Sequence, residues 1–303
     1  MTVTANDVRD AAKRLESHVV ATPLVDAPML SATLGCEVKL KLENLQHTSS
    51  FKARGAFIAM QALPAEARQR GVITMSAGNH AQAVAYHARQ MGIPAVIVMP
   101  AQTPFAKVSR TRSHGAEVVL EGRNLNECEE LVGQLIKERG LSLIHPYDDM
   151  HVMTGQGSVG LEMLTDDPEL DVLVVPIGGG GLIGGIASWY AGRVKVVGVE
   201  PELAPTLTRA LAAGKPVDAP AGGIAADSLA PRQIGQLVFP IAQRHVAQVV
   251  LVTDDAIREA QRTLWEKLRI VAEPGASAAT AALLSGRSEE HTSELQSPDH
   301  LVC

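Results

Sequence analysis

The sequence is poor in cysteine, aromatic residues and net charge, and it contains no long apolar run. Its 3 cysteines are too few and too scattered for a disulfide framework, and no Cys-x-x-Cys pair is present to bind zinc. The 27 basic and 33 acidic residues form no basic patch, so nucleic acid is not an expected partner. No apolar run reaches membrane length, and the N-terminus lacks a basic segment followed by an apolar one. These absences predict a cytoplasmic protein that binds neither nucleic acid nor membrane.

Apolar runs of strand length alternate with helical patterns along nearly the whole chain. Residues 172–175 are apolar at every position, as expected for a strand covered on both faces. The alternation indicates an α/β fold with parallel sheets flanked by helices, and 303 residues suffice for two domains or lobes. The predicted strands are residues 72–76, 95–100, 117–121, 171–177, 195–200 and 248–252, and the predicted helices are residues 8–18, 51–63, 81–91, 125–139, 182–191 and 254–268.

Lys52 is the first candidate for a chemical role, because it lies just after a strand-like run and in the first turn of a predicted helix. The positive end of the helix dipole disfavours an ammonium group there and helps to lower its pKa. Such a position suits a lysine that must act as a neutral nucleophile. Taken alone, however, a lysine at this position is more often an ordinary solvated residue.

A second candidate is the turn at residues 76–82, between a predicted strand and an alanine-rich helix. Small residues at a helix N-terminus let backbone N–H groups approach an anion, and Ser76 and Asn79 add side-chain donors. The turn therefore predicts a carboxylate-binding site. The alternative is an ordinary helix N-cap.

A third candidate is a run of four glycines between a buried strand and a helix, namely Gly178, Gly179, Gly180 and Gly181. Their backbone N–H groups would face a phosphate at the start of the helix. The pattern Gly179-x-Gly181-x-x-Gly184, followed by Glu200 at the end of the next strand, also fits a dinucleotide-binding fingerprint. An NAD-dependent oxidoreductase is therefore an alternative, and close packing of helix on strand is a further one.

A lysine, a carboxylate-binding turn and a glycine loop occur in this order, and in this the chain resembles the fold type II pyridoxal-phosphate enzymes, in the threonine/serine dehydratase and serine racemase branch. The matching stretches are residues 41–46, 50–56, 76–82, 155–157, 178–181 and 273–274. The dinucleotide fingerprint explains only one of them. The resemblance implies a two-lobed architecture like that of tryptophan synthase β, with a large cofactor-binding lobe at residues 1–64 and 149–287 and a small mobile lobe at residues 65–148.

The resemblance also implies an activity, the elimination of water from L-threonine or L-serine to give a 2-oxo acid and ammonia. Lys52 would hold pyridoxal 5'-phosphate as a Schiff base and act as the base at the substrate Cα. The other cofactor-binding residues would be Phe51, Asn79, Gly178, Gly179, Gly180, Gly181, Leu182 and Glu273. The substrate carboxylate would meet Ser76, Asn79 and His80. A homodimer or higher homo-oligomer is expected on the same ground.

Three departures from the family pattern refine this expectation. Ser49 stands where the commoner dehydratase form has glycine, and we expect its small side chain to be tolerated. Ala77 stands where racemases of this branch usually have serine, which favours elimination over two-sided proton transfer. Glu200 is the one candidate ligand for a divalent cation, and without a second carboxylate nearby no tight metal site is expected. Serine racemase or another hydroxy-amino-acid lyase remains the alternative within the family.

The C-terminal segment departs most from the family pattern. Relatives continue into a last buried strand and a turn whose Ser or Cys binds the pyridine nitrogen. Residues 288–303 instead match the translation of a sequencing adapter, which predicts a non-native tail. A missing central strand would leave backbone groups without partners, so an inactive, truncated remnant that still binds the cofactor is a further alternative.

Overall fold

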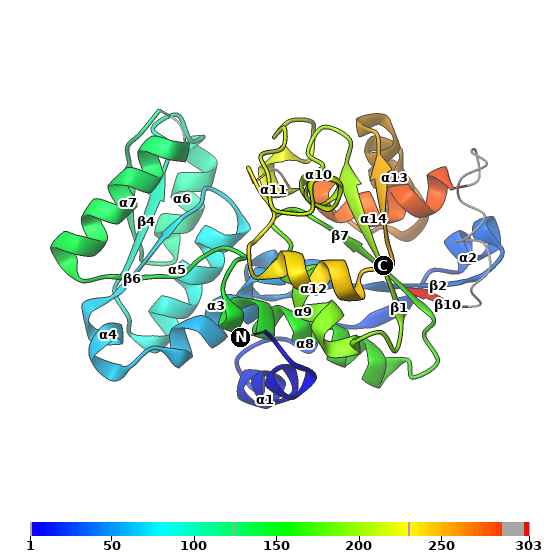
Figure 1. Ribbon diagram of the computed structural model, residues 1–303, viewed down its shortest axis with the longest axis horizontal. Helices are drawn as coiled ribbons and strands as arrows, with labels where there is room; N and C mark the ends of the chain where they lie inside the picture. The colour runs from blue at the N-terminus through cyan, green and yellow to red at the C-terminus, as the bar shows by residue number, and fades with distance from the viewer. Residues whose placement is uncertain (1, 124, 230, 287–299, 303) are drawn as a thin grey trace.

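The computed structural model describes residues 2–123, 125–229, 231–286 and 300–302. The fold contains two sheets of mainly parallel strands, placed side by side (Figure 1). The large sheet has the strand order β1-β2-β10-β7-β8-β9, and the small sheet has the order β5-β4-β3-β6. Of the paired strands, only β1 and β2 run antiparallel. The predicted fold class is therefore confirmed. The strands are β1 (Leu24–Asp26), β2 (Glu37–Lys41), β3 (Val72–Met75), β4 (Ala95–Met99), β5 (Glu117–Leu120), β6 (Ser142–Leu143), β7 (Val172–Pro176), β8 (Lys195–Pro201), β9 (Gln248–Val252) and β10 (His300–Val302).

Helices cover both sheets, and those of the described chain include none long and apolar enough to cross a bilayer. The α-helices are α1 (Ala5–Leu15), α2 (Pro28–Leu34), α3 (Lys52–Ala62), α4 (Ala65–Arg70), α5 (Asn79–Met91), α6 (Phe105–Ser113), α7 (Leu125–Arg139), α8 (Met150–Asp166), α9 (Gly181–Tyr190), α10 (Thr206–Ala213), α11 (Ala226–Leu229), α12 (Val238–His245), α13 (Asp254–Leu268) and α14 (Pro274–Ser285). Two short 3-10 helices, Glu43–Leu45 and His47–Ser49, precede α3.

Each predicted strand and helix is present, with ends that differ by at most a few residues. The longest helix, α8, was not predicted, because it is buried along most of its length and shows no alternation of polar and apolar faces. Its glycines let it approach two other helices closely. A Cβ on Gly155 would lie 2.7 Å from the Arg54 carbonyl oxygen of α3, and one on Gly157 would lie 2.8 Å from the Gly185 carbonyl oxygen of α9.

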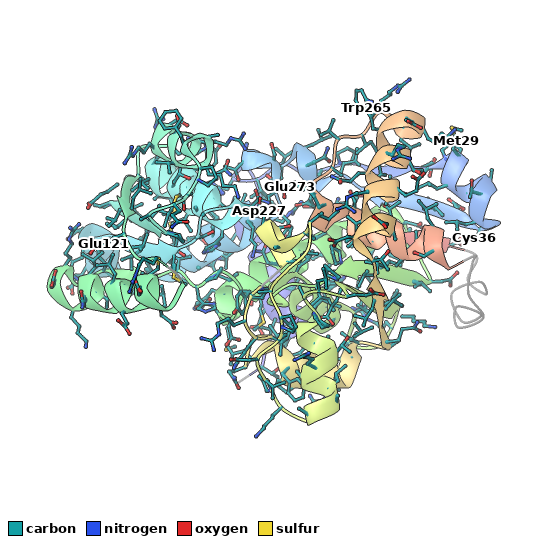
Figure 2. The ribbon with its side chains drawn as sticks, turned by 90° about the horizontal axis from the view of Figure 1, so that it is seen from above. Met29, Cys36, Glu121, Asp227, Trp265 and Glu273 are labelled. Carbon is teal, nitrogen blue, oxygen red and sulfur yellow. The ribbon has the colours of Figure 1, made fainter. Side chains whose placement is uncertain are left out.

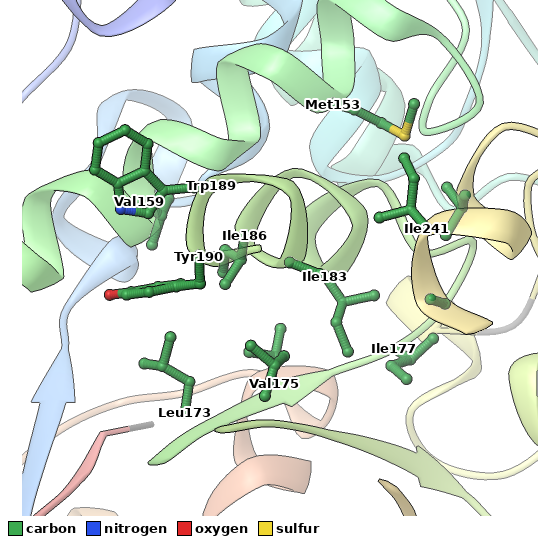
Figure 3. Close-up of a cluster of buried hydrophobic side chains, with 14 of the residues drawn as sticks. Met153, Val159, Leu173, Val175, Ile177, Ile183, Ile186, Trp189, Tyr190 and Ile241 are labelled. Atoms are coloured by element: carbon green, nitrogen blue, oxygen red, sulfur yellow. The ribbon is translucent and has the colours of Figure 1, made fainter. Parts of the chain in front are cut away.

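A cluster of buried hydrophobic side chains covers each face of the large sheet. Leu173, Val175 and Ile177 point to one face, where Ile183 and Ile186 of α9 pack over them (Figure 3). The alternate residues of the same strand point to the other face, which α13 and α14 cover. This two-sided covering explains why the strand sequence is apolar at every position.

The strand β10 corrects one expectation. His300–Val302 lies parallel between β2 and β7, and the Val302 side chain is fully buried. The expectation that the central sheet lacks a strand at this position is therefore wrong. Residues 287–299 and 303 lie outside the described part of the chain, so the adapter origin of the tail stays a prediction.

Candidate active site

Lys52 is the first residue of α3, as its sequence position predicts. Its side chain is half-buried, and its Nζ donates a hydrogen bond to the Pro146 carbonyl oxygen at 2.7 Å. The Phe51 ring lies beside it, with the ring centroid 5.4 Å from Nζ. Burial lowers the pKa of Lys52 to about 8. Roughly one molecule in ten therefore carries a neutral Lys52 amine at pH 7, far more than for an ordinary lysine.

The segment before Lys52 is conformationally strained. Thr48 and Ser49 have φ values of 59° and 57°, in the left-handed region that favours glycine. The Cβ of Ser49 therefore has a backbone cost of about 1–2 kcal/mol, and the tolerance of this side chain stays a prediction. The Ser50 hydroxyl then accepts a hydrogen bond from the Lys52 N–H at 3.3 Å, at the start of α3.

A segment that the sequence analysis missed, residues 144–147, joins the three predicted motifs. The His80 Nε2 lies 3.0 Å from the Ile144 carbonyl oxygen. Two residues further on, the Pro146 carbonyl oxygen accepts the hydrogen bond from the Lys52 Nζ. The Tyr147 ring packs against Gly179 so closely that a Cβ there would lie 2.3 Å from the ring. The polar residues that follow β6 were a signal for this segment, because they lie at the carboxyl end of a parallel strand, as the other motifs do.

The turn at residues 76–82 is not an ordinary N-cap. Helix α5 begins at Asn79, and its N-cap residue Gly78 supplies no side-chain hydrogen bond. The Ser76 hydroxyl accepts from the Gly78 N–H at 3.2 Å. The first N–H groups of a helix have no intrahelical partner, so the start of α5 can receive an anion.

His80 is buried and electrically neutral. Burial, and then the positive charge of Lys52, lowers its pKa to about 3. Its Nε2 faces a carbonyl oxygen and must carry the ring hydrogen, so its Nδ1, which has no partner among the described residues, presents a lone pair. The imidazole therefore cannot donate to a substrate carboxylate in this tautomer. The expected contact between His80 and a substrate carboxylate stays a prediction, for which the backbone N–H of His80, in the first turn of α5, is the donor that remains.

Two contacts join the small-sheet lobe to the large-sheet lobe near this turn. The Asn79 Nδ2 donates to the Glu273 Oε2 at 2.8 Å, and the Lys107 Nζ lies 2.8 Å from the Asp227 Oδ1. Figure 2 shows Asp227 and Glu273 at the junction of the two lobes. The structure thus brings together Asn79 and Glu273, which the sequence analysis placed beside the same cofactor.

The glycine loop follows β7 and leads into α9. Gly180, with φ of 86°, is the N-cap residue, and a Cβ there would also lie 2.5 Å from Val238. The Gly178 carbonyl accepts from the Thr206 hydroxyl at 2.8 Å, and the Gly179 carbonyl accepts from the Gly235 N–H at 3.1 Å. Leu182, in the first turn of α9, packs its side chain on the core. Its N–H is among the first of α9, and such groups have no partner within the helix, so the helix start can receive an anion.

Glu200 is fully buried at the end of β8, and its carboxylate is already occupied by hydrogen bonds. It accepts from the Leu207 N–H at 2.6 Å, the Thr208 N–H at 2.9 Å and both threonine hydroxyls, those of Thr206 and Thr208. Burial raises its pKa. These bonds leave Glu200 unable to hold a ribose hydroxyl, which removes the support for a dinucleotide site. Within the described residues no group of three or more His, Cys, Asp or Glu side chains is placed to hold a metal ion.

Comparison with known proteins shows which family the chain is similar to. The family model of pyridoxal-phosphate dependent enzymes matches residues 15–303. The chain is 40% identical over 286 residues to the L-threonine ammonia-lyase of Thermotoga maritima, covering 93% of this chain and 71% of that protein. The serine racemase of Dictyostelium discoideum superposes with a TM-score of 0.92 at 33% identity, covering 100% of this chain and 97% of the racemase. The processed form of threonine deaminase isoform 2 from Solanum lycopersicum gives a TM-score of 0.90 at 32% identity, covering 98% of this chain and 87% of the deaminase.

Proposed function

The chain belongs to the family of pyridoxal-phosphate dependent enzymes, and from this premise we propose that it is an L-threonine/L-serine ammonia-lyase that eliminates water to give a 2-oxo acid and ammonia. One observation carries the proposal. The segment at residues 144–147 contacts Lys52, the carboxylate turn and the glycine loop. The Lys52 amine, the proposed carboxylate site and the proposed phosphate site therefore all lie beside residues 144–147.

The residues fit pyridoxal 5'-phosphate. The Lys52 amine has a lowered pKa and can react with an aldehyde. The start of α9, with its glycines, suits the dianionic phosphate. Phe51 offers an aromatic face near Nζ, and Asn79 and Glu273 supply an amide and a carboxylate at the lobe junction. When bound, the cofactor supplies an electron sink for the charge that forms at the substrate Cα.

Lys52 performs the proton transfer in this proposal. With the cofactor and substrate bound, the neutral Lys52 amine would accept the proton from the substrate Cα. The Pro146 carbonyl holds Nζ in place, and burial keeps its pKa near working pH, where a general base is most effective. The neutral imidazole of His80 adds no second positive charge beside the amine.

The carboxylate turn positions the substrate. The N–H groups at the start of α5, the Ser76 hydroxyl and the Asn79 amide would bind the substrate carboxylate and so direct the Cα–H bond towards Lys52. Ala77, in the same turn, carries no acid–base group and packs partly into the small-lobe core. Proton return from the opposite face is therefore not supported at this position, which favours elimination over racemisation.

Lobe movement and assembly belong to the same proposal. We take residues 65–148 as a small mobile lobe that closes on substrate, and the Asn79 and Lys107 contacts across the junction support this. The resemblance also supports a homo-oligomer and a cytoplasmic location. Light scattering of purified protein measures the oligomeric state, and fractionation of source cells measures the location.

The deciding experiment measures 2-oxo acid release from L-threonine and from L-serine by purified protein supplied with pyridoxal 5'-phosphate. We expect release from at least one of them, and its loss in Lys52→Ala. Chiral analysis of the remaining serine tests the racemase alternative, which requires D-serine to accumulate. Protein that binds NADH, stays colourless with pyridoxal 5'-phosphate and releases no 2-oxo acid would refute the proposal.

A further inference from the structure

Glu200 and Thr206 are buried polar residues that the proposed reaction does not use, although both lie beside the glycine loop. Both side chains are fully buried, at the end of β8 and at the first residue of α10. Helix α10 has no side-chain cap at its N-cap residue Pro205, and the Glu200 carboxylate takes that place by accepting from the Leu207 and Thr208 N–H groups. Glu200 is thus fixed by the helix start.

The Thr206 hydroxyl bridges Glu200 and the glycine loop. Its Oγ1 lies 3.0 Å from the Glu200 Oε1 and 2.8 Å from the Gly178 carbonyl oxygen. The hydroxyl has a single hydrogen to donate, and of its two acceptors the Gly178 carbonyl oxygen is the nearer.

The direction of the Gly178 carbonyl decides the direction of an amide in the loop. In a trans peptide unit the C=O of one residue and the N–H of the next point in opposite directions. Thr206 holds the Gly178 C=O on the buried side, and so directs the Gly179 N–H away from it. The Gly235 N–H holds the Gly179 C=O in the same manner and directs the Gly180 N–H. Gly179 is itself half-exposed, whereas Gly178 and Gly180 are buried.

We propose that Thr206, anchored by Glu200, is a positioning residue that directs the Gly179 N–H at the cofactor phosphate. The inference rests on the proposed function, because it requires the glycine loop to bind that phosphate. Without the Thr206 hydroxyl the Gly178–Gly179 peptide unit can rotate, and the amide then loses its fixed direction. The affinity for a phosphorylated ligand falls, while that for the same ligand without phosphate does not.

Thr208 offers a matched control. Its hydroxyl donates to Glu200 Oε2 at 2.7 Å and, among the described residues, forms no hydrogen bond to the loop, so Thr208→Val removes a similar hydrogen bond from the same carboxylate. The test titrates apoenzyme with pyridoxal 5'-phosphate and with unphosphorylated pyridoxal, followed by absorbance. Thr206→Val should raise the dissociation constant for pyridoxal 5'-phosphate about tenfold, which is the change expected when about one hydrogen bond to the ligand is lost. Thr208→Val should change it less than about twofold, and Thr206→Ser should restore it.

Three results would overturn the inference. Equal weakening by Thr206→Val and Thr208→Val would show a general effect on α10, and equal weakening for both ligands would show an effect unrelated to phosphate. Wild-type protein that fails to bind pyridoxal 5'-phosphate would overturn the proposed function and this inference with it. Thermal unfolding verifies that each variant folds. If Thr206→Val does not fold, Thr206→Ala replaces it, with the same expected loss for the phosphorylated ligand alone.

Discussion

Arg54 and Glu162 face each other through two hydrogen bonds, from Nη1 to Oε1 at 2.5 Å and from Nη2 to Oε2 at 2.8 Å. The Arg54 side chain is fully buried and makes a second pair of bonds to Glu43. Arg54 lies two residues after Lys52 on α3, and Glu162 lies on α8. The pairing therefore fixes α3, the helix that carries Lys52, against the buried helix α8.

Loss of this pairing should destabilise the fold strongly. Arg54→Met removes the cation that pairs with Glu43 and leaves Glu162 with Lys41 alone, and we expect the free energy of unfolding to fall by about 3–5 kcal/mol. Urea unfolding followed by circular dichroism measures it. The control is Arg139→Met, which breaks an exposed pair with Glu117 and should cost less than about 1 kcal/mol. Similar losses for the two variants would contradict a structural role for Arg54.

The strained backbone at Ser49 predicts a stabilising substitution. Ser49→Gly removes the Cβ from a residue with φ of 57° and should raise the free energy of unfolding by up to about 1 kcal/mol, after the greater chain entropy of glycine is subtracted. Ser142→Gly, in the extended strand β6, has no such strain to relieve and should destabilise by about 0.5–1 kcal/mol. Thermal and urea unfolding measure both variants. The prediction is wrong if both substitutions destabilise alike.

The lowered pKa of Lys52 predicts how stability depends on pH. The folded pKa, about 8, lies below the ordinary value of 10.5, so between these values the unfolded chain binds more protons and stability rises with pH. Below pH 8 the folded protein carries the full cost of removing the Lys52 ammonium group from water. Apoprotein with Lys52→Met should therefore be more stable than wild type below about pH 8, and this advantage should shrink as the pH approaches about 10.

The control for this prediction is Lys215→Met, which changes an exposed lysine. Its effect on the free energy of unfolding should not vary across the same pH range. A Lys52→Met advantage that is constant with pH would show that packing, and not charge, is its source.

Contact between Tyr147 and the glycine loop predicts a loss of cofactor affinity. In Gly179→Ala the new methyl would lie 2.3 Å from the Tyr147 ring, so the ring or the loop must move. We expect at least roughly a tenfold rise in the dissociation constant for pyridoxal 5'-phosphate, on the order of one lost hydrogen bond or more. Gly133→Ala on α7 meets nothing within 4 Å, and it should leave this affinity unchanged while stabilising the helix by about 1 kcal/mol. Unchanged affinity in Gly179→Ala would contradict the placement of the phosphate at the loop.

Much of the fold and of the site is encoded locally in the sequence. The strand at residues 172–176 is apolar at every position because helices cover both its faces, and the glycine run follows this strand directly. These features depend on residues close together in the chain. Helix α8 was missed because its burial removes the polar face by which a helix is normally detected.

The sequence alone determined the alternation of strands and helices, and it identified Lys52 and the two turns as candidate binding residues, because short-range periodicity and turn chemistry specify these features. Only the tertiary structure decided which groups meet. The Lys52 amine reaches a carbonyl 94 residues away, Thr206 reaches Gly178 from another strand–helix turn, and Glu200 is closed to other ligands by the start of α10. Even the orientation of the His80 ring depends on a carbonyl 64 residues distant. Such contacts arise when distant segments pack into one core, and no local pattern in the chain records them.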